Sequence, residues 1–191
     1  MRRTVVAPFV LLAALAGLAA TAGAAGAPKP VVGTDAKGDV HSALDLTRVS
    51  VARGADGRLR ASLTLAAAWG GDALLASSGP PGSVCLKLWV TSAAPDFPPD
   101  LLVCATADKD GQLRGSVLKE RANKLPERIA GAEVSRPSAR TATLRFSQTA
   151  IGRPAKVTVA AETTRPGCPR ASCIDTAPDA PKTLELVLRK G

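Results

Sequence analysis

Apolar and polar residues alternate along most of the chain with a period of two, which is typical of half-buried β-strands. In residues 58–65 the apolar odd positions share one predicted face, and the Arg, Ser and Thr positions between them share the other. The apolar parity changes between Leu46 and Val49, which predicts a β-bulge near Thr47 and Arg48. The predicted strands occupy residues 44–51, 58–65, 84–91, 101–107, 113–118, 129–135, 141–146, 155–163 and 183–189.

Turn signals separate these runs. Gly54-Ala-Asp-Gly57 predicts a hairpin turn, and Asp108-Lys-Asp-Gly111 predicts another. Helix is indicated only around Ser147–Ile151, with a possible turn in 118–125. About nine strands with regular turns predict an all-β fold, an antiparallel β-sandwich of jelly-roll type. A closed barrel stays open as an alternative, because alternation is the same in both architectures.

Residues 1–26 are typical of a secretory signal peptide. Arg2 and Arg3 are followed by an uncharged apolar stretch and by small residues suited to cleavage. We expect the mature chain to begin between Ala25 and Pro28, so that residues 27–191 form a single secreted domain of extracellular location. The alternative is an uncleaved membrane anchor, since the apolar run is nearly long enough to span. After cleavage we expect no membrane attachment, because no second apolar segment follows.

Four cysteines in an exported chain predict a disulfide framework with three possible pairings. Cys85 and Cys104 both fall on the polar-facing side of predicted strands, which favours a bridge between them. Cys168 and Cys173 are close in sequence and flanked by turn-forming Pro and Gly, which favours the second bridge. The alternative, a four-cysteine zinc site, lacks a C-x-x-C arrangement.

The charge is unevenly distributed. The full chain carries a formal net charge of +9, but residues 25–113 are balanced at −1 and all nine of their acids are Asp. Residues 114–191 carry +8. A basic half favours an anionic partner such as a cell-wall glycan or another anionic surface. The alternative is an ordinary solvated face, because the basic residues are dispersed. We expect no nucleic-acid partner.

Candidate catalytic residues are scarce. The chain has one His and no Tyr, and its single Met lies in the signal segment. Two-histidine metal catalysis and haem held by two His or Met ligands are therefore excluded, and no Gly-x-Ser-x-Gly motif is present. We assign no catalytic residue. The alternative is an extracellular, glycosidase-like hydrolase that uses Asp carboxylates near His41.

Aromatic residues that could stack on a ligand are also few. Strand parity places Phe146 and Trp69 inside the fold, whereas Trp89 falls on the polar side with Lys87. Trp89 is therefore the one candidate ligand-binding ring. The alternative is that it packs against a disulfide and Phe97.

Three aspartates indicate a metal site. Asp35, Asp39 and Asp45 fall in one loop region, where Gly33 and Gly38 allow tight backbone paths. Crowded carboxylates are typical ligands of calcium, the only cofactor that the sequence suggests. The alternative is that these carboxylates accept backbone N–H groups as turn caps.

The Asp35-x-x-Gly38-Asp39 loop, the Leu44-Asp-Leu46 run and the following hairpin resemble the opening of family-9-like carbohydrate-binding and DOMON-like domains. The segment Asp175-Thr-Ala-Pro-Asp179 is similar to their closing segment. The resemblance implies an exported sandwich that binds sugar, haem or calcium. Haem ligands are missing here, and the two Trp residues are predicted to face opposite sides of the sheet. What the resemblance implies for this chain is therefore the fold and the Asp loop, and not the ligand. We therefore expect a secreted, non-catalytic domain of binding or structural type.

Overall fold

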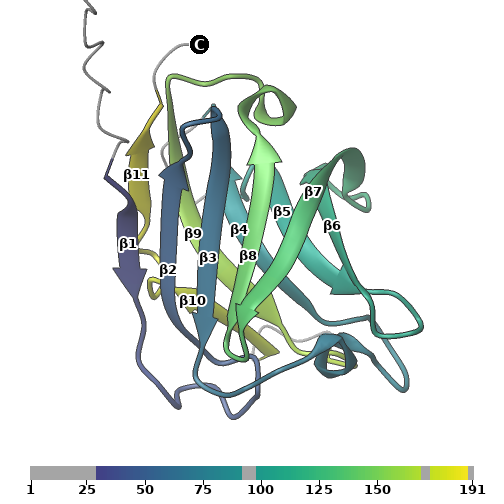
Figure 1. Cartoon of the computed structure of the whole chain (residues 1–191). Helices are drawn as coiled ribbons and strands as arrows, with labels where there is room; N and C mark the ends of the chain where they lie inside the picture. The colour runs from purple at the N-terminus through teal and green to yellow at the C-terminus, as the bar shows by residue number, and fades with distance from the viewer. Residues whose placement is uncertain (1–28, 92–97, 169–172, 189–191) are drawn as a thin grey trace, which may run out of the picture.

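Antiparallel strands build one continuous sheet in the computed structural model, which describes residues 29–91, 98–168 and 173–188 (Figure 1). The chain order of the elements is β1 (Val31–Thr34), β2 (Leu46–Arg53), β3 (Arg58–Leu65), η1 (Gly71–Leu74), β4 (Ser83–Trp89), β5 (Leu101–Ala107), β6 (Leu113–Lys119), β7 (Glu127–Ser138), β8 (Thr141–Ser147), η2 (Gln148–Ile151), β9 (Lys156–Thr164), β10 (Ile174–Ala177) and β11 (Leu184–Val187). Within the described ranges, no helix is long and apolar enough to cross a membrane.

The strands follow the order β1-β2-β3-β8-β7-β6-β5-β4-β9-β10, and β11 pairs with β9. The long strand β7 carries the sheet from its front layer to its back layer, because its C-terminal part pairs with β8 and its N-terminal part with β6. The all-β antiparallel prediction is confirmed. The architecture, however, is one nearly closed, barrel-like sheet rather than the two separate sheets of the predicted sandwich.

The core lies inside this curved sheet and is formed by the predicted apolar faces. Leu59, Ala61, Leu63 and Leu65 are all fully or almost fully buried, and so is Phe146 of β8. The polar residues between them face outward, so local alternation alone decides which side chains form the core. The predicted bulge is confirmed by a register shift between Leu46 and Arg48.

The predicted hairpin turn between β2 and β3 is also confirmed. Gly57 has a φ of 74°, a left-handed conformation that favours glycine, and its N–H donates to the Gly54 carbonyl at 3.0 Å. The turn at 108–111 is built in a similar way, since Gly111 has a φ of 75° and the Asp108 side chain accepts from two backbone N–H groups.

The two ends of the strand order meet and nearly close the sheet. Gly33 of β1 lies so close to the opposite edge that an added Cβ would stand 2.9 Å from Pro178 Cδ and 3.2 Å from Leu184 Cδ1. Two hydrogen bonds join the start of β2 to the same edge: Leu46 N–H donates to Asp175 Oδ2, and Thr163 Oγ1 donates to the Leu44 carbonyl. We call this region the closing edge, meaning β1, the 35–45 loop and the start of β2 together with β10 and residues 178–184.

Both predicted disulfides are confirmed. Cys85 and Cys104 lie directly opposite each other on β4 and β5, on the outward side of the sheet. Cys168 and Cys173 form the second bridge. With all four cysteines oxidised, the alternative four-cysteine zinc site is wrong. The predicted signal segment and Phe97 lie outside the described residues.

Candidate functional site

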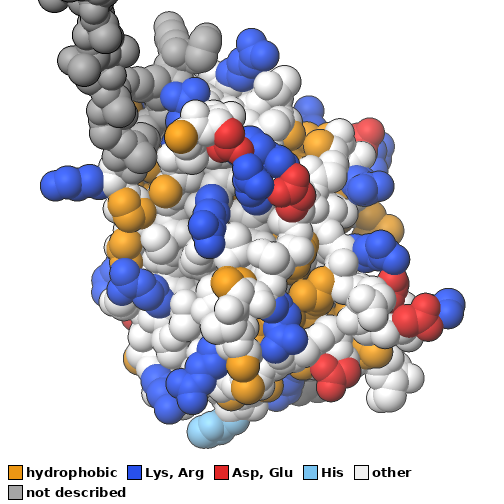
Figure 2. Space-filling view, in the orientation of Figure 1, with side chains coloured by type: hydrophobic (Ala, Val, Ile, Leu, Met, Phe, Trp, Pro, Cys, Tyr) orange, Lys and Arg blue, Asp and Glu red, His pale blue; other side chains and the backbone are white. Residues whose placement is uncertain are grey.

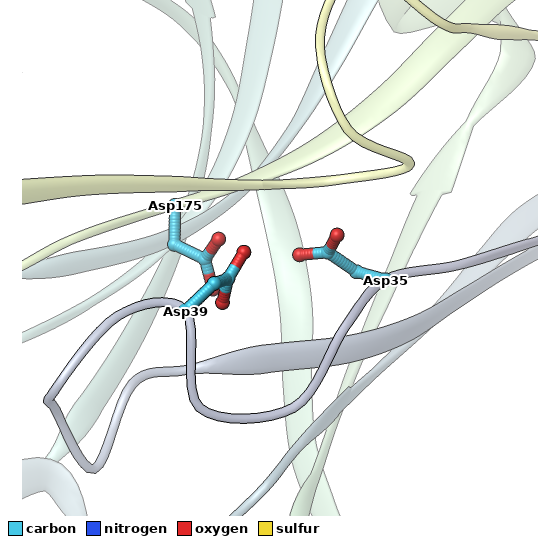
Figure 3. Close-up of side chains that lie close together, drawn as sticks. All are labelled: Asp35, Asp39 and Asp175. Carbon is cyan, nitrogen blue, oxygen red and sulfur yellow. The ribbon is translucent and has the colours of Figure 1, made fainter.

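An aspartate cluster at the closing edge is the strongest candidate site. One carboxylate oxygen from each of Asp35, Asp39 and Asp175 lies within 4.8 Å of the others. Asp35 and Asp39 belong to the loop that follows β1, whereas Asp175 is on β10, far away in the sequence. Figure 3 shows the three carboxyl groups pointing toward one another across the gap between these segments.

The position of Asp35 follows from the backbone around it. Its N–H donates to the Thr47 carbonyl at 3.1 Å, which extends the β1–β2 pairing by one residue and directs its side chain toward β10. Gly38 then turns the chain with a φ of 91°, so that Asp39 comes back to the same place. The prediction that glycine allows a tight backbone path in this loop is therefore confirmed at Gly38.

Asp45 has a different position from the one predicted. It is 3% exposed, and its Oδ2 accepts the Gly38 N–H at 2.8 Å, so part of this carboxylate caps the loop. Its Oδ1 is shielded from solvent and has no hydrogen-bond partner among the described groups. Asp45 is close enough to raise the pKa of Asp175, so its buried carboxylate lies near the cluster.

Asp175 is a member of the cluster that the sequence did not indicate. It is 5% exposed and accepts the N–H groups of Leu46 at 2.5 Å and Thr176 at 2.8 Å. The only signal in the sequence was its place in the Asp175–Asp179 segment. Its proximity to Asp35 depends on which sheet edges meet, and strand alternation does not contain that information.

Burial and mutual repulsion disfavour the charged form of the carboxyl groups in this cluster. Both carboxyl oxygens of Asp35 are shielded from solvent, and no hydrogen bond of ordinary length and angle reaches them within the described chain, although the Asp179 carboxyl group and the Ala36 N–H lie close enough to affect the pKa of Asp35. Burial, together with the neighbouring carboxyl groups of Asp179 and Asp175, raises the pKa of Asp35 to about 7. Burial and the charges of Asp39 and Asp45 likewise raise the pKa of Asp175.

Trp89 is not available as a stacking platform in this structure. Its ring is 5% exposed, and the Lys87 ammonium lies 5.8 Å from the ring centroid on the same side of the sheet. Together with Pro178 and Pro181 it lines a hollow of only about 40 Å³. Trp69 is buried at 5% exposure, as its inward parity predicted, and the Arg136 guanidinium lies 5.2 Å from its ring.

His41 lies on the exposed part of the 35–45 loop. The hydrolase alternative requires it to converge with carboxylates in an accessible cleft. The Asp35 carboxyl group has a raised pKa, which suits an acid catalyst, but its oxygens are shielded from solvent. This geometry favours binding of a small cation over attack on a polymer.

Another hollow, of about 740 Å³, lies elsewhere. It opens at the ends of β4, β5 and β6 near η2, and Leu101, Ile129 and Ile151 are among its apolar lining. Glu120 stands in its lining, and burial together with the charge of Glu162 raises the pKa of this carboxyl group. Its lining includes residues on both sides of segment 92–97, which lies outside the described chain.

Comparisons of this chain with protein-family models, with curated proteins and with solved structures found no match.

Proposed function

We propose that this chain is a secreted, non-catalytic domain of binding or structural type, and that a calcium ion stabilises its closing edge. The observation that carries the proposal is the approach of Asp35, Asp39 and Asp175 to within 4.8 Å, contributed by opposite ends of the strand order. The two disulfides support an oxidising destination.

Calcium suits this donor set because it binds 6–8 oxygens, mostly from carboxylates and carbonyls, without strict geometry. Asp35 contributes two shielded oxygens that no hydrogen bond of ordinary geometry satisfies within the described chain, and Asp45 contributes one more. A dication would offset the repulsion among these carboxylates and make it unnecessary for Asp35 to keep a proton. The cation would then tie the loop after β1 to β10.

The turn-cap alternative explains only part of the cluster. Asp45 and Asp175 do accept backbone N–H groups, as that alternative predicts. Asp39 accepts no hydrogen bond within the described residues and is exposed, yet its carboxylate faces the other two. A cation site gives both Asp39 and Asp35 a role that capping does not.

Thermal melts of the secreted form test the proposal, with calcium, with magnesium and with chelator. Calcium should raise the melting temperature by mass action. Asp39→Asn should remove that rise and leave the melt in chelator nearly unchanged, because this exposed side chain holds no backbone group. Asp110→Asn, an exposed aspartate on the β5–β6 turn, is the matched control and should keep the full response.

Identical wild-type melts with calcium and with chelator would contradict the proposal. If calcium still raises the melting temperature of Asp39→Asn, the ion binds at another site. A larger rise with magnesium than with calcium would exclude calcium as the preferred ion, since magnesium requires a tighter octahedral geometry.

A further inference from the structure

Three hollows on the outer face of the sheet meet at Arg58. They measure about 660, 600 and 290 Å³. The first two share Arg58, Glu133 and Val134, and the last two share Asp56 and Arg58. Together they form a trough over β3, β8, β7 and β6 that reaches the β2–β3 turn; we call it the arginine trough.

The charged lining of the arginine trough is dominated by one residue type. Its basic side chains are all arginines, and only two acidic side chains, Asp56 and Glu133, line it with them; the arginines are Arg53, Arg58, Arg60, Arg114, Arg128, Arg145 and Arg153. A guanidinium presents a planar fork of donors that matches carboxylate, sulfate or phosphate oxygens in pairs, which a lysine does not. Figure 2 shows the front of this face, where basic side chains are spread over the surface and acidic groups lie against some of them.

The acidic side chains neutralise only part of this charge. Glu133 pairs with both Arg58 and Arg145, and Asp56 pairs with Arg145. Asp108, outside the lining, pairs with Arg114. Arg60 and Arg128 are exposed and make no ion pair within the described residues. The trough therefore retains free guanidinium groups at separate points along its length.

Two shielded polar atoms along the trough lack a hydrogen-bond partner among the described residues. The Thr143 side chain faces outward into the trough, yet the residue is 5% exposed and its Oγ1 has no hydrogen-bond partner among the described groups. The Arg53 Nε, at the other end of the trough, is likewise shielded and unpartnered. Ser62 and Ser135 flank Thr143 in the strand register, so hydroxyl groups form a row across three strands.

We propose that the arginine trough binds a linear acidic polysaccharide. Its carboxylate or sulfate groups would pair with the free guanidinium groups, and its hydroxyl groups would bond to the Ser and Thr row. The trough contains no aromatic side chain, so it offers no stacking surface for nucleic-acid bases. This inference rests on the binding-type part of the proposed function and deepens it by naming a ligand class; it does not depend on calcium.

Immobilised polysaccharides test the inference at physiological salt, with the secreted form in calcium. The probes are hyaluronate, which carries carboxylates, chondroitin sulfate, which adds sulfates, and pullulan, which is neutral. Binding to at least one acidic chain and none to pullulan is expected. Arg60→Gln combined with Arg128→Gln should raise Kd about tenfold or more, since charge-assisted hydrogen bonds are the stronger kind.

A matched double variant separates this site from general attraction to a basic protein. Lys124→Gln with Arg140→Gln removes the same charge from exposed positions outside the trough, and it should change Kd less than about twofold. Equal losses in the two double variants would overturn the inference, and so would failure of every acidic chain to bind. Tighter binding of oligo-dT than of either acidic chain would also overturn it. The melts with and without calcium report separately on the metal proposal.

Discussion

The closing edge and the arginine trough each gather charges of one sign, but they tolerate those charges in different ways. At the closing edge, Asp35, Asp45 and Asp175 hold carboxyl oxygens that are buried or shielded, and burial raises the pKa of Asp35 to about 7. In the trough, Arg60 is exposed, and water screens it from its neighbours.

The difference shows that burial, more than the number of charges, decides whether a like-charge cluster affects folding. A buried carboxylate loses hydration that only a proton, a donor or a cation can replace. An exposed guanidinium keeps its hydration, so the trough can stay charged in the free protein and be ready to pair with a ligand. We therefore expect the closing edge to control stability and the trough to control binding.

The largest expected effect is on the pH dependence of stability without calcium. In the folded state Asp35 keeps its proton until about pH 7, whereas in the unfolded chain it loses it near the ordinary value of 3.8. The folded state thus binds more protons between these values, and its free energy of unfolding falls as pH rises; the linkage limit is about 4 kcal/mol, and solvent screening of this partly exposed group reduces it. Calcium should remove this fall by replacing the proton.

Urea denaturation from pH 4 to pH 8 measures this effect, in chelator and in calcium. Asp35→Asn is the control that removes the titrating group and leaves the other acids in place. In chelator, the free energy of unfolding of the wild type should fall with pH relative to that of Asp35→Asn. In calcium this relative fall should disappear. Parallel curves for the two proteins in chelator would show that Asp35 does not titrate abnormally.

Asp175→Ala should have the next largest effect. In calcium it removes a ligand and leaves the buried Leu46 N–H without an acceptor, which should cost about 2–4 kcal/mol of the free energy of unfolding. In chelator the loss should be smaller, because the substitution also relieves repulsion with Asp39 and Asp45. Arg60→Ala in the trough should change stability by less than about 0.5 kcal/mol. Chemical denaturation compares the variants, and an equal loss in calcium and in chelator would contradict a metal role for Asp175.

Much of this fold could be predicted from the sequence, and the reason is local. Alternation in residues 58–65 and 141–146 decides which side chains form the core, and the Gly54–Gly57 turn decides how β2 meets β3. The edge strands β1 and β10 were not predicted, because each has four residues and too little alternation to distinguish it from a loop.

The candidate sites depend on long-range pairing and could be predicted only in part. Asp35 and Asp39 were identified because they are close in sequence, whereas Asp175 reaches them only because the sheet curves until its edges meet. The same closure decides between a barrel-like sheet and a sandwich, and alternation is equal in both. The arginines of the trough are spread from residue 53 to residue 153, and the strand register brings them together.

Gly33→Ala tests how tightly the closing edge is packed. The new methyl group would stand 2.9 Å from Pro178 Cδ and 3.3 Å from Val49 Cγ1, so the edges must separate slightly, at a cost of about 1–2 kcal/mol. Gly131→Ala in the trough is the matched change, because its nearest neighbour is the Arg128 guanidinium at 3.8 Å. We expect that variant to be neutral or slightly more stable. Thermal melts compare the two variants. Equal losses of stability would mean that the closing edge is no more tightly packed than the trough.

Glu133→Gln should have the smallest effect on stability and an opposite effect on binding. Glu133 is more than half exposed, so the loss of its pairs with Arg58 and Arg145 should cost less than about 1 kcal/mol. The same substitution frees the Arg58 guanidinium for a polyanion and leaves Arg145 paired with Asp56 alone, and we expect Kd for the acidic polysaccharide to fall about twofold to threefold. The gain should shrink as salt is raised, because exposed charges are screened. Weaker binding by this variant would show that Glu133 positions the arginines rather than competing with the ligand for them.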